Sequence, residues 1–330
     1  MLDFISIPKI DAHIHYNYDR STLCKLGDQF KFRFLTINTD VPFFPSLEVQ
    51  QRISKQIRSQ FPGSLDFICT FETSSLFESD WSNRAISQIQ TSLNSGAIGV
   101  KVWKNIGMNL RDPSGNLITI DNPLFDPVFD FLEKEKITVI GHLGEPRNCW
   151  LPVDKMTVAS DRNYFSAHPE YHMHLHPEFP DYSTQIRARN LRLHKNPDLR
   201  FVGAHLASLE WNVDEISKWL KEYHGCAVDL AERINHLQLQ SITNHKKIRE
   251  FFEAYQDRII YGTDIIDDGS MSEEQLVQEL TNRWLDHWNF FSSGEPLSSP
   301  EFPGTFHGLN LTPEILAKIY QKNASNWYGF

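Results

Sequence analysis

The sequence predicts an α/β protein: a (β/α)8 TIM barrel with long lid loops after strands five and eight. Two observations support this fold class. Eight short apolar runs alternate with segments of helical periodicity between Asp11 and Asp264. Five of these runs carry a potential metal ligand or base near one end, and the active sites of such barrels lie at strand ends.

The strands are expected to be buried on both faces, because the runs are continuous and rich in Val, Ile and Phe. They span residues 9–13, 32–38, 66–71, 97–103, 137–142, 200–205, 226–230 and 258–262. Between them, apolar residues at three- and four-residue spacing and Pro or Gly stop signals indicate helices. The expected helices are 46–60, 79–94, 123–134, 183–195, 212–223 and 243–255, with a closing helix at 312–321.

Two connections are longer than the usual βα loop of about two to six residues. Residues 143–182 follow strand five, and residues 265–311 follow strand eight. Both leave the C-terminal ends of strands, so both are expected to overhang the site as lids. The first contains His168, His172, His174 and His176 among prolines, and we interpret this cluster as lid surface.

The composition fits one barrel domain over residues 1–330, longer than the typical ~250 residues because of loop insertions. The net charge of −10 disfavours nucleic-acid and anionic-membrane binding. No apolar run approaches the ~18 residues of a membrane helix, and the N-terminus does not resemble a signal peptide. Four scattered cysteines suggest a reduced, cytoplasmic protein. We expect a small-molecule substrate and leave a homodimer open.

The candidate site residues are of metal-binding type. His13 and His15 are two apart in a strand, so their imidazoles face the same small volume. His142, His205 and Asp264 follow strands five, six and eight. Imidazole and carboxylate suit Zn²⁺, Mn²⁺, Fe²⁺ or Co²⁺, which lower the pKa of bound water towards ~7. A carboxylate such as Asp264 can then take the water's proton.

The motifs IDAHIH, GVKVWKNIGM, VIGHLGEP, FVGAHLAS, YQDRIIYGTD and LAKIYQKNAS extend from Ile10 to Tyr328. The chain resembles the amidohydrolase superfamily and, within it, the decarboxylase-like amidohydrolase-related branch. The resemblance implies one divalent ion, expected to be Zn²⁺, bound by four ligands. These ligands are His13, His15, His142 and Asp264. His205 would be the acid/base facing the water, or would ligate a second ion together with Lys101.

Lys101 has three interpretations, and its neighbour Trp103 should face the barrel interior with it. Lys101 is a carboxylated bridge between two ions, an ammonium that binds an acidic substrate, or a buried partner of Glu72. Our expectation is one ion and a free, substrate-binding Lys101. Arg233, after strand seven, is a candidate carboxylate clamp, with a salt bridge to Glu232 or Asp229 as its alternative.

The function expected from these residues is hydrolysis of a C–N or C–O bond in a small, carboxylate-bearing amide, lactone or ester. The catalytic residues would be Asp264 and His205, and the substrate would contact Lys101, Trp103 and Arg233. The alternative is nonoxidative decarboxylation or hydration of a small carboxylic acid, which uses the same residues. A non-catalytic barrel would require the loss of ligands, and here the set is complete.

Overall fold

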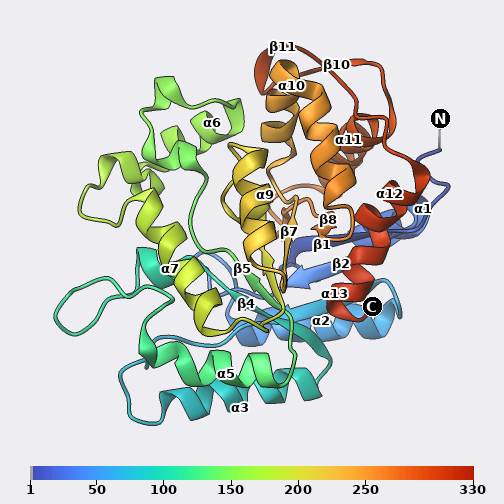
Figure 1. Cartoon of the computed structure of the whole chain (residues 1–330). Helices are drawn as coiled ribbons and strands as arrows, with labels where there is room; N and C mark the ends of the chain where they lie inside the picture. The colour runs from blue at the N-terminus through green and yellow to red at the C-terminus, as the bar shows by residue number, and fades with distance from the viewer. Residues whose placement is uncertain (1–2) are drawn as a thin grey trace.

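The computed structural model describes residues 3–330, which form a closed parallel barrel surrounded by helices (Figure 1). The barrel strands are β1 (Lys9–Tyr16), β2 (Phe32–Ile37), β3 (Leu65–Cys69), β4 (Ala97–Val102), β5 (Val139–Gly141), β6 (Phe201–Gly203), β7 (Cys226–Asp229), β8 (Ile259–Ile260) and β9 (Ile265–Asp267). Their order in the sheet is β8-β7-β6-β5-β4-β3-β2-β1-β9. The predicted (β/α)8 fold class is therefore confirmed.

The barrel closes along β1, because the chain on either side of Gly262 pairs with this strand. The amide of Ala12 donates to the carbonyl of Tyr261 at 3.0 Å, and the amide of Asp264 donates to the carbonyl of His13 at 2.7 Å. Strand β9 then pairs with the last three residues of β1. A Cβ at Gly262 would lie 2.8 Å from the Cβ of His13, so this close approach requires glycine.

The main helices are α1 (Thr22–Phe30), α2 (Leu47–Gln60), α3 (Trp81–Asn94), α5 (Asp126–Lys134), α7 (Tyr182–Lys195), α9 (Val213–Glu222), α10 (Ile234–Ala254) and α11 (Glu273–Ser292). Shorter helices are α4 (Asn105–Met108), α6 (Ala159–Ala167), α8 (Ala204–Ala207), α12 (Pro313–Ala317) and α13 (Asn323–Tyr328). A two-stranded hairpin, β10 (Pro296–Ser299) and β11 (Phe302–His307), lies outside the barrel. None of the described helices is long and apolar enough to cross a membrane.

Two expectations about the C-terminal third need correction. Residues 265–311 do not form a lid loop: they fold as β9, α11 and the hairpin. The sequence does contain signals for helix α11. Ser272 and Gln275 form a capping box, and apolar residues recur at every fourth position from Leu276 to Trp288. The closing helix, expected at 312–321, is α12 joined to α13 by a π-helical turn at Lys318–Lys322.

The segment 143–182 is also not a plain loop. It contains α6 and four 3-10 turns at Arg147–Trp150, Val153–Lys155, Pro169–Tyr171 and Met173–Leu175. Four of its residues, Cys149, Met156, Phe165 and Met173, form a small apolar cluster with Met108 of α4. Two tyrosines of this segment, Tyr164 and Tyr171, line the cavity at the barrel mouth. Closure of either segment over the site stays a prediction.

The apolar core has two layers, one inside the barrel and one between strands and helices. The interior holds small and β-branched side chains such as Ala12, Ile37 and Val202. A β-bulge in β1 shifts its pairing with β2 between Asp11 and Ile14. Because of this shift, Ile10 and Ala12 fill the interior below the site, and His13 and His15 also face inward above them.

Candidate metal centre

The predicted ligand residues converge on the C-terminal mouth of the barrel. His13 and His15 extend from β1, His142 follows β5, and Asp264 lies between β8 and β9. His205 belongs to α8, directly after β6. His13 is fully buried, His205 is 3% exposed and His15 is 7% exposed. Side chains from the first strand and from residues 142, 205 and 264 therefore meet in one buried volume.

Each of three imidazoles has its Nδ1 atom held by an acceptor. The Nδ1 of His13 lies 2.7 Å from Oδ2 of Asp229, and that of His15 lies 2.8 Å from the carbonyl oxygen of Ile37. The Nδ1 of His205 lies 3.0 Å from the carbonyl oxygen of Ala231. Carbonyl and carboxylate oxygens only accept, so Nδ1 carries the proton and Nε2 keeps its lone pair. This is the arrangement of metal-binding histidines.

The free Nε2 atoms face the carboxylate of Asp264. Its Oδ1 is 3.2 Å from Nε2 of His13 and 3.3 Å from Nε2 of His15. The Nε2 of His13 and the Oδ1 of Asp264 are buried without a hydrogen-bond partner among the described residues. Ligand atoms of His13, His205 and Asp264 all lie within 4.8 Å of one another. Lone pairs that face each other in a dry site fit a bound cation.

The electrostatics of the mouth keep these groups in their ligand forms. Burial lowers the pKa of His15, and it holds the pKa values of His142 and His205 well below the usual range. Burial opposes the ionisation of Asp264, but the surrounding imidazoles, above all His13 and His205, hold its pKa well below the usual range. These shifts favour neutral imidazoles at His15, His142 and His205 and an ionised carboxylate at Asp264.

His205 is placed by an unusual backbone. The four residues from His205 to Ser208 have φ values of 55 to 56°, one turn of left-handed helix without glycine. Such a conformation costs roughly 1–2 kcal/mol per residue. The turn is held by hydrogen bonds from the His205 amide to Asp229 at 2.7 Å and from the Ser208 hydroxyl to the Gly144 carbonyl at 2.9 Å. The guanidinium of Arg189 donates to the Ala207 carbonyl.

His142 lies at the edge of the cluster. Its ring centroid is 4.3 Å from that of His205, and its Nε2 is 3.4 Å from Oε2 of Glu145. This Nε2 is buried and has no hydrogen-bond partner in the described chain. The tightest group is thus His13, His205 and Asp264, with His15 and His142 beside it. The assignment of His142 as a ligand and of His205 as acid/base stays a prediction.

Lys101 and Trp103 both line the cavity at the metal centre, as expected of neighbours in β4. Lys101 is 1% exposed. Burial lowers its pKa to about 8, against the opposing effect of the nearby carboxylates of Asp264 and Asp229. Glu72 is exposed and binds Ser74, and no ion pair with Lys101 occurs in residues 3–330. The structure therefore gives no support to the Lys101–Glu72 interpretation.

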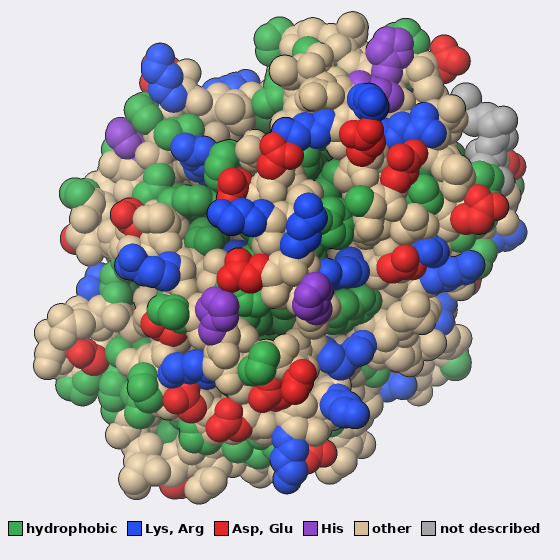
Figure 2. Space-filling view, in the orientation of Figure 1, with side chains coloured by type: hydrophobic (Ala, Val, Ile, Leu, Met, Phe, Trp, Pro, Cys, Tyr) green, Lys and Arg blue, Asp and Glu red, His purple; other side chains and the backbone are tan. Residues whose placement is uncertain are grey.

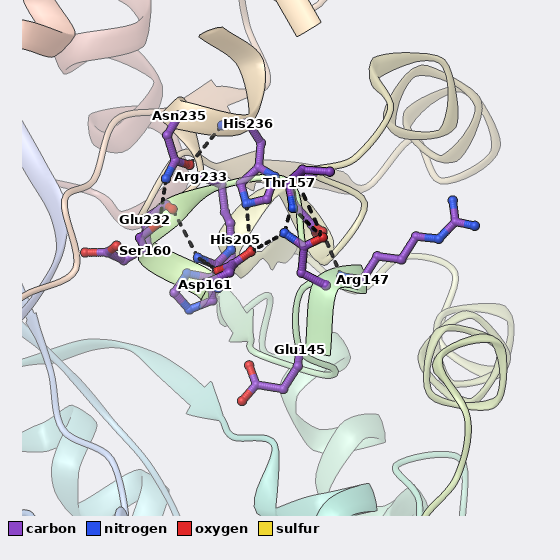
Figure 3. A network of polar contacts seen from close by, with 12 residues as sticks. Glu145, Arg147, Thr157, Ser160, Asp161, His205, Glu232, Arg233, Asn235 and His236 are labelled. Carbon is purple, nitrogen blue, oxygen red and sulfur yellow. Dashed lines mark hydrogen bonds and ion pairs between the residues drawn. The ribbon is translucent and has the colours of Figure 1, made fainter. Parts of the chain in front are cut away.

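Arg233 lies apart from this cavity, in a buried polar network shown in Figure 3. Its Nη1 is 3.8 Å from Oδ1 of Asp161 and 3.1 Å from the carbonyl oxygen of Glu232. The Nε2 of His236 approaches the same carboxylate at 3.2 Å. Neither expected salt bridge forms, since the Glu232 carboxylate binds Arg283 and Asp229 binds His13.

The histidine cluster of residues 168–176 shows no metal-like grouping within the described chain. The Nε2 of His172 bonds to the carbonyl of Leu151 at 2.8 Å, and the Nε2 of His176 bonds to that of Pro169 at 2.9 Å. These imidazoles make contacts within their own segment.

Three polar residues of the mouth were not predicted as site residues. Asp229 ends β7 and orients His13, while Lys104 and Glu145 form an ion pair beside His142. Lys104 also lines the cavity. Asp229 could have been predicted as a site residue, because it is a carboxylate at the end of the seventh apolar run. Nothing local in the sequence pairs Lys104 with Glu145, 41 residues away.

The cavity at the metal centre is small, about 110 Å³. Its walls combine cations and aromatic rings with the metal-binding groups. They are His15, Thr39, Val41, Phe43, Phe44, Lys101, Trp103, Lys104, His142, Tyr164, Tyr171, His205, Asp264 and Ile266. Phe44 packs on His15 with ring centroids 5.0 Å apart.

The barrel and its mouth define an enzyme of the α/β-barrel class. Residues 80–330 match the amidohydrolase family, and the chain belongs to that family. The resemblance seen in the sequence motifs is therefore confirmed. Amidohydrolases generally bind a divalent metal, and the His13, His205 and Asp264 group is a site where one fits. No curated protein matches the chain.

Solved structures with the same fold have diverse activities. The chain is 13% identical to 2,6-dihydroxybenzoate decarboxylase from Rhizobium (TM-score 0.53; 98% of each chain covered). It is 12% identical to 4-oxalomesaconate hydratase from Rhodopseudomonas palustris (TM-score 0.52; 97% of this chain and 95% of that one). Dihydroorotase from Saccharomyces cerevisiae is 12% identical (TM-score 0.50; 98% and 84%). At these identities the likeness shows the fold alone.

Proposed function

We propose that this protein hydrolyses a C–N or C–O bond in a small, carboxylate-bearing amide, lactone or ester with the aid of one divalent metal. One observation carries this proposal. The Nδ1 atoms of three imidazoles are hydrogen-bonded to acceptors, which leaves their Nε2 atoms free beside the Asp264 carboxylate. Within an amidohydrolase barrel, this set suits Zn²⁺, with Mn²⁺, Fe²⁺ and Co²⁺ as alternatives.

The ligands in this proposal are His13, His15, His142 and Asp264. When bound, the ion supplies Lewis acidity and a water of pKa ~7. Asp264 is ionised and faces the free Nε2 atoms, so it can accept the proton of the attacking water. His205 keeps an unprotonated Nε2 in the same volume and can relay that proton to the leaving group. Asp229 orients His13.

The substrate's carboxylate would be held by the cations of β4 and its following turn. Lys101 and Lys104 both line the cavity, and Trp103 forms a wall between them. Lys104 already pairs with Glu145, so Lys101 is the ammonium most available to a substrate. Arg233 does not line this cavity, and its Nη1 faces Asp161 at 3.8 Å, so its contact with the substrate stays a prediction. A cavity of about 110 Å³ restricts the substrate to a small molecule.

The second candidate is nonoxidative decarboxylation or hydration of a small carboxylic acid at the same residues. The two ammonium groups at the cavity favour it, because they can hold a substrate carboxylate beside the metal centre. Lys101, with a pKa of about 8, is largely protonated at neutral pH and can deliver a proton to carbon.

The test is a metal analysis of the purified protein combined with paired activity screens. One screen follows hydrolysis of small amides, lactones and esters, each with and without a carboxylate. The other follows CO2 release from carboxylated dienoates and phenols. We expect one ion per chain and hydrolysis of the acidic members. Full activity without any bound metal would refute the site, and CO2 release without hydrolysis would establish the second candidate.

We propose that residues 1–330 form one catalytic unit. We also propose a cytoplasmic location, where thiols stay reduced; the four cysteines are free and buried, namely Cys24, Cys69, Cys149 and Cys226.

A further inference from the structure

A second cavity, larger than the one at the metal centre, lies between α10, α11 and the β10–β11 hairpin, which gather on one side of the barrel in Figure 1. Its volume is about 320 Å³, within the range of ligand pockets. Glu232 and Thr263, which follow β7 and β8, form its inner wall. The two cavities share no lining residue, although Thr263 of the second directly precedes Asp264 of the first.

The lining of this cavity carries excess negative charge. Glu232, Asp286 and Glu301 contribute carboxylates, and Arg283 contributes the balancing guanidinium. Arg283 is already engaged, since it bonds to Glu232 and to the carbonyl of Thr263 at 2.9 Å. His287 adds no charge, because burial lowers its pKa to about 3. The charge balance therefore favours a cationic ligand.

Asp286 and Glu301 are the carboxylates left over after the Arg283–Glu232 pair. No residue of the described chain donates a hydrogen bond to the Asp286 carboxylate or pairs with it. Asp286 is an exposed residue of the cavity lining, and the partial burial of its carboxylate raises its pKa. One oxygen of Glu301 accepts from the Ser160 amide at 2.7 Å, and no other bond to this carboxylate occurs in residues 3–330.

An amide side chain also faces the cavity without a partner. The side chain of Gln238 on α10 is 7% exposed and lines the cavity, yet it makes no hydrogen bond within the described chain. Its neighbour Asn235 is satisfied by Ser160 at 2.9 Å, as Figure 3 shows. Gln238 is therefore free to bind a ligand.

The opposite wall supplies apolar surface and hydroxyl groups. Phe306, which is 3% exposed, and Leu297 come from the hairpin, and Ser298 and Ser299 lie beside them. An aromatic ring next to amides, hydroxyls and carboxylates suits a molecule with a C–H face and several hydroxyl groups. This combination is more specific than negative charge alone.

We propose that this cavity is a second ligand site, for a hydroxylated organic ammonium compound of the size of an amino sugar. The carboxylates of Asp286 and Glu301 hold the ammonium group, Gln238 binds hydroxyl groups, and the apolar face of the ligand contacts Leu297 and the small exposed part of Phe306. The site is independent of the reaction assigned to the metal centre.

Three probes of equal shape and different charge test the site: glucosamine, glucose and glucuronate. Each is titrated into the metal-loaded protein by isothermal calorimetry, with ligand-observed NMR for weak binding. We expect saturable binding in the order glucosamine, glucose, glucuronate. Asp286→Asn should weaken glucosamine binding at least tenfold, and Gln238→Leu should weaken glucosamine and glucose alike. The matched control is Asp198→Asn, an exposed carboxylate before β6, which should bind as the unsubstituted protein does.

A repeat on chelated protein separates the two cavities. Binding of glucosamine should persist without metal, because no proposed ligand contact belongs to the metal centre. The proposal is overturned if no probe binds saturably, if glucuronate binds best, or if Asp286→Asn binds glucosamine normally. It is equally overturned if chelation abolishes binding, which would locate glucosamine at the metal centre.

Discussion

At the level of single residues, the acceptor that binds each Nδ1 atom decides which ring nitrogen of the imidazole carries the proton. Asp229 is the strongest of these acceptors, because it is a buried carboxylate that binds Nδ1 of His13 and the amide of His205 at once. The His13 imidazole, followed by the imidazole and amide of His205, holds the pKa of Asp229 below the usual range despite its burial. A single carboxylate thus orients two of the residues that face Asp264.

Asp264→Asn should reduce kcat by about 10²- to 10⁴-fold, the usual contribution of a general base. The amide keeps the size of the carboxylate but cannot take up the water's proton. Metal content, measured by mass spectrometry of the dialysed protein, should fall much less than activity. An Asp264→Asn variant that retains most of its activity would make Asp264 a structural residue and would remove the proposed mechanism.

Lys101→Met should leave the metal in place and raise KM for carboxylate-bearing substrates. An ammonium is charged below its pKa, so the contribution of Lys101 should decline as pH rises through about 8. The fall of kcat/KM above this pH should be absent in Lys101→Met, which makes the pH profile the deciding measurement.

A carboxylated Lys101 would contradict the prediction of a free ammonium group. If Lys101 is carboxylated and bridges two ions, the intact mass will include one CO2 on this residue. Lys101→Met would then lose two ions together. Either result would replace the one-ion site with a binuclear one.

At the level of elements, the left-handed turn from His205 to Ser208 is the most strained part of the site. Four non-glycine residues adopt φ of 55 to 56°. A Cβ at Gly203 would lie 2.5 Å from the Cβ of Ala207, so the turn also folds tightly onto the end of β6. The strain persists because Asp229, Gly144 and Arg189 anchor the turn from three directions.

Ala207→Gly should be less destabilising than the same substitution in an ordinary helix. Glycine adopts positive φ without the cost of roughly 1–2 kcal/mol that a Cβ incurs there. The matched control is Ala85→Gly in α3, which is 3% exposed against 2% for Ala207, so both variants lose one buried methyl group. In the right-handed α3, glycine costs about 1 kcal/mol.

The free energies of unfolding of these two variants, measured in urea, should differ by about 2 kcal/mol in favour of Ala207→Gly. Equal destabilisation would show that the turn is not strained in the protein.

Helix α11 shows how an element outside the site supports it. The indole of Trp284 stacks on Phe32 at 3.8 Å between ring centroids and donates to Asp11 at 3.3 Å. Asp11 in turn accepts from the amide and hydroxyl of Thr263, the residue before Asp264. Helix α11 therefore packs over the contact between β8 and β1, and it holds in place the backbone that positions Asp264.

At the level of the whole molecule, metal binding should couple to stability, because the ligands come from both ends of the barrel sequence. A ligand at 100 times its Kd stabilises the folded state by about 2.7 kcal/mol. Chelation of the loaded protein should therefore lower Tm by several degrees and abolish activity, and Zn²⁺ or Mn²⁺ should restore both. The measurement is differential scanning calorimetry with and without chelator.

The control for this experiment is His13→Ala, which should lack the chelator-dependent shift while remaining folded. An unchanged Tm together with full activity in excess chelator would exclude a metal centre at the barrel mouth.

The surface agrees with a small-molecule substrate. Figure 2 shows basic and acidic side chains interspersed on the face in view, without a broad area of one sign. With a net charge of −10, this surface offers little attraction to a polyanion.

The sequence by itself determined the barrel and the strand ends that carry the ligands. Alternating apolar runs and helical periods are local signals, and the two-residue period of β1 was enough to place His13 and His15 together. Glycine at 262 and the Asp264 that follows also belong to a local pattern. These features depend on neighbours a few residues apart, so no tertiary information was needed to predict them.

Only the tertiary structure decided how these groups are paired. Asp229 meets His13 across 216 residues, and Trp284 meets Asp11 across 273. The turn at His205, the partner of Lys104 and the position of Arg233 likewise depend on contacts between distant elements. Barrel closure creates these contacts, because it brings the ends of successive strands to one mouth, and no local sequence pattern records which side chains will face each other there.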